Sequence, residues 1–515
     1  MTNIYELKNR QLVPNWRDFK RTIKIGELGL KNKSKQLIVD NSDIKLDWAN
    51  NKTIGVAADL INNSFVSSEL YSSELEEAIK FVETNSIDAS NSLLTLIQQI
   101  KNELNPKNED STKVLERNIQ SMEEFNSLFD DKIVNRIISK TKNLTRNYHD
   151  NAIYWIELAR LYTIKGQLKQ AEKCVTIALN LAPDNRFVLR SAVRFFIHIE
   201  EEERAIFYLR KSKLINSDPW LISAHIASSR LLNRYSPFIK KGLALVASKN
   251  YSDFDLTELA SSLGTIELAS GSFKKSKSLI ELSISNPNDN SLAQFEWLSK
   301  KEQRLIFKPE QFINVKNPFE AFTYENFKKG NFKESFYNCI DWFLDMPFSK
   351  RPLAFGSYIA TVLQEYDFAI LLCLIGLKYD NNDVEFVNNL VYNYCLKNEI
   401  GKAEKYLNQY FGKTNVEINH NEVKITLQAT VGLFYLRSNN TEEGKKFYEM
   451  AIENSLILKN NYYYNLAIIN LTRELYYLND DEFKDYFEKF KEIKTVDSDI
   501  IYQKEQVEKI INSTN

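Results

Sequence analysis

Residue types that can do chemistry are spread along this 515-residue chain without forming a reactive set. The four histidines stand apart from cysteines and carboxylate patterns, and the four cysteines include no C-x-x-C pair, so no metal-ligand spacing is present. Ser272 and Lys275 satisfy S-x-x-K but lack the other motifs of that enzyme class. No phosphate-binding glycine loop occurs. The sequence therefore predicts that the protein is not an enzyme and holds no metal and no cofactor.

A different chemistry is suggested by three tyrosines that recur at intervals of 34 residues: Tyr324, Tyr358 and Tyr392. Phenol rings give rigid contact area, and their hydroxyls can pair with the backbone of an extended chain. Asn388 and Asn389 place amide groups beside the third ring. The alternative is that these tyrosines pack one repeat against the next. In either case the elements that position them are repeated units.

The stretch from Ala152 to Asn185 shows what the repeated unit is. Its residues follow the pattern W-x2-L-G-x2-Y…A-x3-F…P, at Trp155, Leu158, Ala159, Tyr162, Gly166, Ala171, Val175, Ala178 and Pro183. Small residues let two antiparallel helices approach closely, a glycine makes the turn between them, and the proline ends the second helix. In these residues the chain resembles the tetratricopeptide repeat (TPR) family, whose period is about 34 residues.

The resemblance, which covers about 150–494, implies an all-α fold: a right-handed TPR-like α-solenoid of antiparallel helix pairs. A single pair cannot bury its apolar face, so the pairs must stack. We expect four parts: 1–150, a mostly helical N-terminal region of unclear fold; 151–305, a first TPR-like block; 306–494, a second; and 495–515, a C-terminal helix or tail.

The resemblance also implies where a partner binds, because the first helices of TPR pairs line the concave groove. Mapping the groove positions onto this chain gives the predicted partner-binding residues Tyr324, Phe327, Arg351, Phe355, Tyr358, Asn388, Asn389 and Tyr392, with Ile156 and Arg160 in the first block. The family's well-known carboxylate clamp uses lysine and asparagine at positions 5 and 9. Here position 9 is tyrosine throughout, which argues against that mode of recognition.

Near the N-terminus, Trp16 and Phe19 follow Pro14 in a polar segment. Apolar residues close to a terminus usually tie it down. We expect this aromatic pair to be an N-terminal anchor that packs against the solenoid or against a partner.

Charge and hydropathy narrow the classes of partner. Lys plus Arg number 67 against 68 Asp plus Glu, a net charge of −1, and this balance argues against nucleic acid as the partner. No window approaches ~18 uninterrupted apolar residues, and the N-terminal residues lack an apolar core of the length that a signal peptide needs, so we expect a cytoplasmic protein without membrane contact. The abundance of Asn, Lys and Ile is typical of an AT-rich bacterial genome.

These observations predict a protein–protein interaction scaffold or regulatory subunit. It would bind a partner protein or peptide segment in the concave TPR groove, within a bacterial multi-component complex. The alternative is a subunit of an anti-phage (antiviral defence) or toxin-control complex that contacts RNA or DNA.

Overall fold

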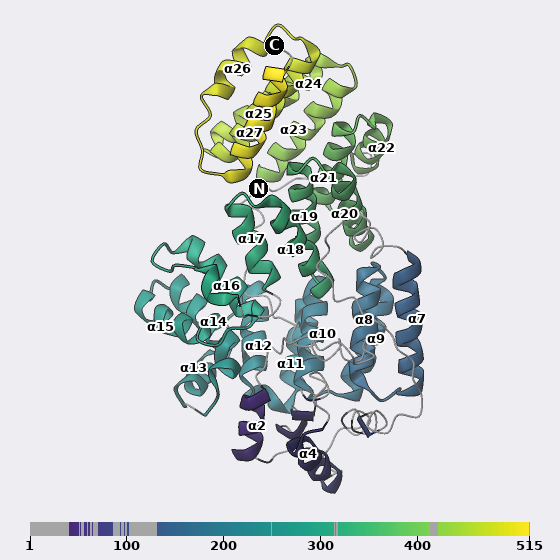
Figure 1. Cartoon of the computed structure of the whole chain (residues 1–515), viewed down its shortest axis with the longest axis vertical. Coiled ribbons are helices and arrows are strands. Elements are labelled where there is room, and N and C mark those ends of the chain that lie inside the picture. The colour runs from purple at the N-terminus through teal and green to yellow at the C-terminus, as the bar shows by residue number, and fades with distance from the viewer. Residues whose placement is uncertain are drawn as a thin grey trace. The chain divides into compact units, whose positions relative to one another are not determined.

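The computed structural model describes residues 131–513 except 249, 314, 316–317 and 412–420, together with parts of 41–101. These residues form α-helices joined by short turns, two 3-10 helices and no strand (Figure 1). The fold is the all-α, TPR-like α-solenoid of antiparallel helix pairs that the sequence predicts. No described helix is long and apolar enough to cross a membrane.

The unit from Ala152 to Asn185 forms the helix pair that its pattern predicts, α8 (Ala152–Ile164) and α9 (Leu168–Leu181). Asn151 caps α8 by accepting a hydrogen bond from the Ile153 amide. Gly166 takes a positive φ of 70° in the turn, a conformation that glycine adopts without strain. The three small residues Ala159, Ala171 and Ala178 are fully buried where the two helices meet.

The helix pairs divide into two compact units. The N-terminal unit holds the described residues up to Ala321 together with Asp341–Ser349, and the C-terminal unit holds Phe322–Ile340 and the described residues from Lys350 onward. The predicted division of the repeats into blocks that meet at 305 stays a prediction.

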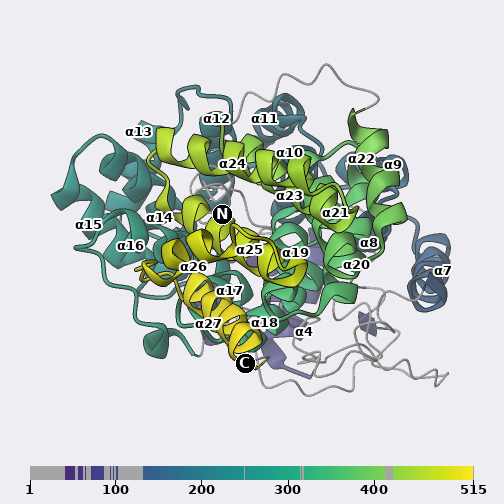
Figure 2. The same ribbon diagram turned by 90° about the horizontal axis from the view of Figure 1, so that it is seen from above.

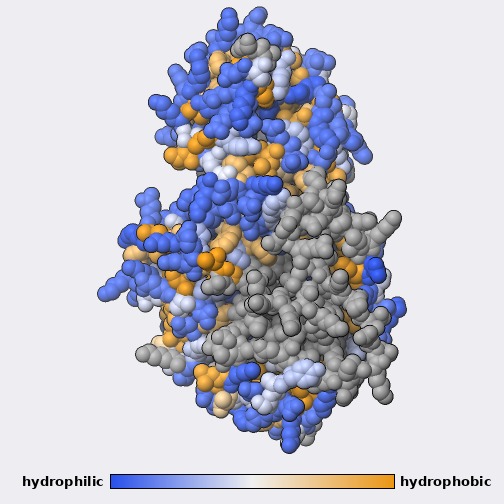
Figure 3. Space-filling model, viewed as in Figure 1, coloured by the Kyte–Doolittle hydropathy of each residue, from blue (hydrophilic) through white to orange (hydrophobic). Residues whose placement is uncertain are grey.

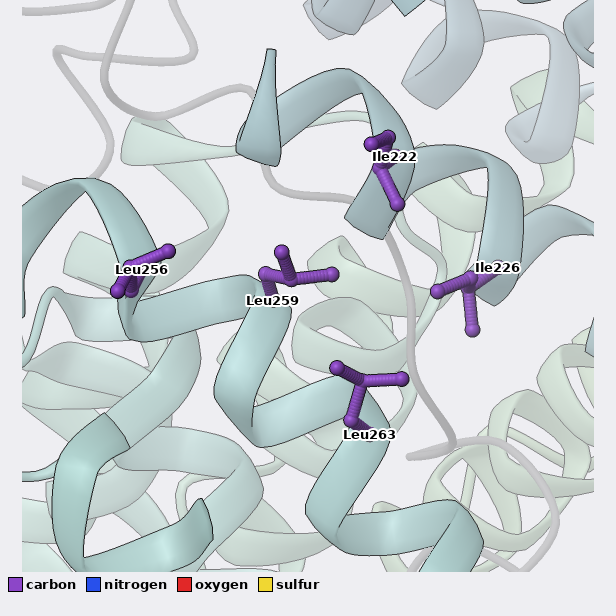
Figure 4. Close-up of a cluster of buried hydrophobic side chains, with 5 residues drawn as sticks. All are labelled: Ile222, Ile226, Leu256, Leu259 and Leu263. Carbon is purple, nitrogen blue, oxygen red and sulfur yellow. The ribbon is translucent and has the colours of Figure 1, made fainter. Parts of the chain in front are cut away.

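The N-terminal unit contains the following helices: α2 (Asn41–Asn50), α4 (Ser73–Thr84), α7 (Asp131–Asn147), α8, α9, α10 (Arg186–His198), α11 (Glu202–Lys211), α12 (Pro219–Leu231), α13 (Ile239–Ser248), α14 (Asp253–Ala269) and α16 (Asp289–Lys301), with α15 (Phe273–Ser283) beside α14. Part of its core lies between α12 and α14. There, five aliphatic side chains interdigitate (Figure 4): Ile222, Ile226, Leu256, Leu259 and Leu263. The described parts of 1–150 are mostly helical.

The C-terminal unit begins within α17 (Phe319–Lys328) and includes most of α18 (Phe332–Asp345). Its other helices are α19 (Arg351–Val362), α20 (Tyr366–Tyr379), α21 (Val384–Leu396), α22 (Ile400–Phe411), α23 (Asn421–Arg437), α24 (Thr441–Ile457), α25 (Asn461–Leu478), α26 (Phe483–Lys491) and α27 (Ser498–Ser513). Successive members pack as antiparallel pairs, such as α19 with α20 and α23 with α24. Over α24 and α26 the visible surface is mostly hydrophilic, with hydrophobic residues scattered among polar ones (Figure 3).

Most of 495–515 lies in the helix α27. It lies beside α25 and also contacts α19 (Figures 1 and 2). One side of it is apolar and buried through Ile500, Val507 and Ile511. Helix α27 is therefore part of the packed C-terminal unit, and it covers the face of α19 on which Tyr358 lies.

Candidate binding surface of the C-terminal unit

The predicted tyrosine series starts in an aromatic cluster. Tyr324 of α17 is 1% exposed and stacks on Phe355 of α19, with ring centroids 4.8 Å apart. Phe327 contacts the same ring at 4.9 Å and the ring of Tyr358 at 6.0 Å. Arg351, at the start of α19, is buried as well. In this part of the series the side chains pack repeat on repeat, as the alternative interpretation of the sequence has it.

Tyr358, the second tyrosine of the series, is held by the last helices of the chain. Its hydroxyl donates to Asp499 Oδ2 of α27 at 2.5 Å, and the hydroxyl of Tyr462 of α25 donates to the same oxygen at 2.6 Å. Gln503 of α27 donates its amide to the Tyr358 hydroxyl at 3.3 Å. The sequence separates Tyr358 from Asp499 by 141 residues, so only the folded chain brings them together.

Burial controls the charge of this cluster. Asp499 is 1% exposed, and burial raises the pKa of its carboxyl group, although the two tyrosine hydroxyls that donate to it work in the opposite direction. Burial also raises the pKa of Tyr358 and of Tyr462, and the nearby Asp499 carboxylate adds to both shifts. The phenols are therefore neutral hydrogen-bond donors at physiological pH, and none is poised to act as a nucleophile.

Tyr392, the third tyrosine, closes a polar network on α21. Its hydroxyl donates to Asn470 Oδ1 of α25 at 2.6 Å. One turn earlier, Asn389 donates its amide to Ser357 Oγ of α19 at 3.0 Å, and Asn388 donates to Asn389 Oδ1 at 3.4 Å. The three predicted residues of α21 thus share one inner surface with α19 and α25.

A cavity of about 80 Å³ opens on this surface, between α19, α21, α23, α24, α25 and α27. It has room for a few water molecules or for one small side chain. Among its lining residues, three carry buried polar atoms that have no hydrogen-bond partner within the described residues: Asn388 Oδ1, Tyr448 OH and Tyr463 OH. An unpaired buried polar group costs roughly 1–3 kcal/mol. A ligand group that enters the cavity and pairs with them would remove part of that cost.

The residues predicted in the first block lie in the N-terminal unit and are also buried. Ile156 is fully buried. Arg160 donates from Nε to Glu157 Oε2 at 2.8 Å and from Nη1 to the carbonyl of Leu344 at 3.3 Å. Arg160 thus takes part in an internal ion pair. The predicted anchor residues Trp16 and Phe19 lie outside the described residues.

Sequence reasoning missed two charged networks. In the N-terminal unit Arg190 donates from Nη2 to both carboxylate oxygens of Glu258 at 2.8 Å, and its guanidinium lies 4.4 Å from the Trp220 ring centroid. In the C-terminal unit Arg437 and Arg473 flank a single buried carboxylate, Glu474. The available signal was a charged pair, Arg473-Glu474, in the middle of an otherwise mostly apolar or aromatic stretch.

The four cysteines are buried, and none of them forms a disulfide. Burial raises the pKa of Cys373 and of Cys395 to about 12, so both are neutral thiols at physiological pH. No group of three His, Cys, Asp or Glu side chains that could hold a metal occurs in the described part of the chain. The chemistry that this surface offers is hydrogen bonding and charge pairing.

Comparison with solved structures gives helical-repeat proteins of low similarity. The crystal structure of yeast Tom70 is 15% identical, with a TM-score of 0.29 and 76% of this chain and 95% of that chain covered. The human IFIT1 dimer with m7Gppp-AAAA is 10% identical, with a TM-score of 0.33 and 81% of this chain and 95% of that chain covered. No family model and no curated protein matches this chain. The fold assignment therefore rests on the helix pairs themselves.

Proposed function

We propose that this protein is a non-enzymatic scaffold or regulatory subunit that binds a segment of a partner protein on the inner surface of the C-terminal unit. The observation that carries the proposal is the cavity beside Asn388, where three buried polar atoms have no partner among the described residues. Buried polar groups in folded proteins are nearly always hydrogen-bonded, and exceptions call for an explanation. A bound side chain or backbone group supplies one.

The size of the cavity limits what can bind. About 80 Å³ accepts one small side chain and excludes a helix, whose diameter with side chains is roughly 10–12 Å. The amide of Asn388 and the hydroxyls of Tyr448 and Tyr463 can both donate and accept hydrogen bonds. The proposal is therefore an extended segment that inserts a polar side chain between α21 and α25.

As the biological setting we propose a cytoplasmic, bacterial multi-component complex, on the basis of the Asn-, Lys- and Ile-rich composition and of the solitary repeat architecture. The second candidate, an anti-phage or toxin-control subunit that contacts RNA or DNA, has the same fold. The two candidates differ in what the chain retains at high salt, because phosphate contacts weaken steeply as salt rises.

The test is affinity capture from the native host with the wild-type chain and with Asn388→Leu, washed at moderate and at high salt. Leucine has nearly the same size but no acceptor, and the one hydrogen bond that it removes is the long one, of 3.4 Å, from Asn388 to Asn389 Oδ1. Asn408→Leu is the matched control, since Asn408 is exposed on the outer helix α22. Protein in the eluate is identified by mass spectrometry and nucleic acid by staining.

We expect one stoichiometric protein that survives high salt with the wild type and with Asn408→Leu, and at least about tenfold less of it with Asn388→Leu. Equal capture by Asn388→Leu would show that the partner binds elsewhere. Recovery of RNA or DNA that high salt removes would favour the second candidate.

A further inference from the structure

A second cavity in the C-terminal unit, of about 270 Å³, holds more cationic than anionic groups. Helices α19, α20, α21, α23, α25 and α27 all contribute to its wall. Its polar and charged lining residues include Arg437, Arg473, Tyr366, Tyr392, Gln503 and Gln506. No aspartate or glutamate is among the described residues that line it.

Two of the lining residues, Arg437 and Arg473, form a cluster with Glu474, and the net charge of this cluster can be counted. Glu474 is 1% exposed and accepts from Arg437 Nη2 at 3.0 Å and from Arg473 Nε at 2.8 Å. The Nε atom of Arg437 lies 2.5 Å from the other carboxylate oxygen. Arginine stays protonated in proteins, so two positive charges face one negative charge. The cluster therefore carries one uncompensated positive charge in a largely buried place.

The uncompensated charge is directed at the cavity. Arg473 lines the cavity, and its buried Nη2 atom makes no well-formed hydrogen bond among the described residues, although the Tyr392 hydroxyl interacts with this guanidinium. The guanidinium of Arg437 lies 5.3 Å from the ring centroid of Tyr477. Burying a charge is costly unless it is paired and hydrogen-bonded. An anion in the cavity would pair with the second positive charge, which Glu474 alone does not neutralise.

The cavity also has features that select among anions. One uncompensated charge matches one singly charged carboxylate, whereas a phosphate dianion would leave an excess of negative charge. The planar guanidinium fork suits the two oxygens of a carboxylate. Gln503 and Gln506 offer amide donors, and Leu396, Ile469 and Val507 offer apolar contact to a short hydrocarbon stem.

We propose that this second cavity binds a carboxylate group on a short apolar stem, paired with Arg473 and Arg437. The inference rests on the proposed function: the two cavities share Thr361, Tyr392 and Gln503, so one extended segment can reach both. The bound segment then carries an acidic side chain beside the polar one that enters the first cavity. A free carboxylic acid has the same chemistry and is the other source.

The experiment titrates the full-length chain with butyrate, which reproduces the end and stem of an acidic side chain, and follows binding by saturation-transfer NMR. Inorganic phosphate at matched ionic strength is the competing anion. Two blocked tripeptides, acetyl-Ala-Glu-Ala-amide and acetyl-Ala-Gln-Ala-amide, separate an acidic side chain from a free acid. The variants are Arg473→Gln, Glu474→Gln and, as a control, Arg304→Gln in an exposed pair of the N-terminal unit.

The two variants in the cluster shift the dissociation constant of butyrate in opposite directions. Arg473→Gln removes the uncompensated charge and raises Kd at least about tenfold, because a charge-assisted hydrogen bond is lost. Glu474→Gln raises the cluster to two positive charges and lowers Kd. Arg304→Gln leaves Kd unchanged. A variant that merely unfolds cannot tighten binding, so the Glu474→Gln arm keeps the proposal falsifiable.

Several results would overturn the proposal: equal Kd values across all variants, tighter binding of phosphate than of butyrate, or no butyrate binding at all. Stronger binding of the Glu tripeptide than of the Gln tripeptide supports the acidic side chain as the source, and butyrate binding without that preference supports a free acid.

If butyrate binds as expected while Asn388→Leu retains its captured protein, the scaffold proposal fails alone. If butyrate does not bind while Asn388→Leu loses the protein, the carboxylate pocket fails alone.

Discussion

The two units treat buried charge in different ways. In the N-terminal unit Arg190 meets both oxygens of Glu258, and Asn288 donates a further hydrogen bond to that carboxylate at 2.8 Å. In the C-terminal unit two arginines share Glu474, and Arg473 Nη2 makes no well-formed hydrogen bond among the described residues. The Glu258 carboxylate, which accepts hydrogen bonds from both Arg190 and Asn288, fixes how its helices pack. A cation that lacks a well-formed hydrogen bond leaves a place for a ligand.

The same contrast extends to the neutral polar groups of the C-terminal unit. The hydroxyls of Tyr358 and Tyr462 are used within the chain, because both donate to Asp499. The hydroxyls of Tyr448 and Tyr463 have no partner among the described residues. Both kinds of tyrosine are buried, so burial alone does not tell a structural residue from a binding residue. The inventory of hydrogen-bond partners does.

The largest effect is expected from breaking the paired charge of the N-terminal unit. Glu258→Gln removes the carboxylate that pairs with the buried Arg190 and should lower the free energy of unfolding by about 3–5 kcal/mol. Urea denaturation with hydrogen exchange over α10, α14 and α16 measures it. Glu302→Gln, in the exposed pair with Arg304, is the control and should change little. Equal effects of the two substitutions would show that the buried pair contributes no more to stability than the exposed pair does.

A second substitution tests how tightly the C-terminal unit is packed outside the cavities. A Cβ at Gly376 of α20 would lie 2.3 Å from the Phe386 ring, so Gly376→Ala should cost about 1–3 kcal/mol or more. Gly401 of α22 has no neighbour within 4 Å of such a Cβ, so Gly401→Ala should be neutral or stabilise by up to about 1 kcal/mol. Thermal unfolding of both variants checks the difference, and equal midpoints would contradict the packing described.

The contrast between used and unused hydroxyls is tested by a matched pair of substitutions. Tyr358→Phe removes a donor to the buried Asp499 and should destabilise the C-terminal unit by about 1–3 kcal/mol. Tyr448→Phe removes a hydroxyl that has no partner among the described residues, so it should be neutral or slightly stabilising in the free chain. In the presence of the captured partner, Tyr448→Phe should weaken binding. Equal destabilisation by both would mean that Tyr448 is also used internally.

The smallest effect concerns pH. Because the folded state raises the pKa of Asp499, the folded chain binds a proton more readily than the unfolded chain does. Stability therefore falls as pH rises from the ordinary pKa of aspartate to the raised one, by about 1.4 kcal/mol for each unit of the shift. Asp499→Asn should remove this dependence. Urea unfolding of both chains between about pH 4 and 7 measures it, and parallel curves would assign the dependence to other groups.

The sequence was a sufficient guide to the helix pairs because their determinants are local. Gly166 in a turn, Pro183 after a helix and small residues at 159, 171 and 178 act within one 34-residue unit. The interval between Tyr324, Tyr358 and Tyr392 likewise placed them on one series of helices. The same mapping selected Asn388, Asn389 and Tyr392, which line the smaller cavity.

What covers those residues could be decided only by the tertiary structure. Tyr358 meets Tyr462 and Asp499 across 104 and 141 residues of sequence, and no periodicity in the chain relates those positions. The pairing of Arg437 and Arg473 on one carboxylate depends in the same way on how α23 and α25 pack. The sequence by itself determined that the chain is a stack of helix pairs with aromatic inner faces. The fold decided which of those polar groups are satisfied within the chain, because hydrogen-bond partners from distant helices are fixed only when the helices pack.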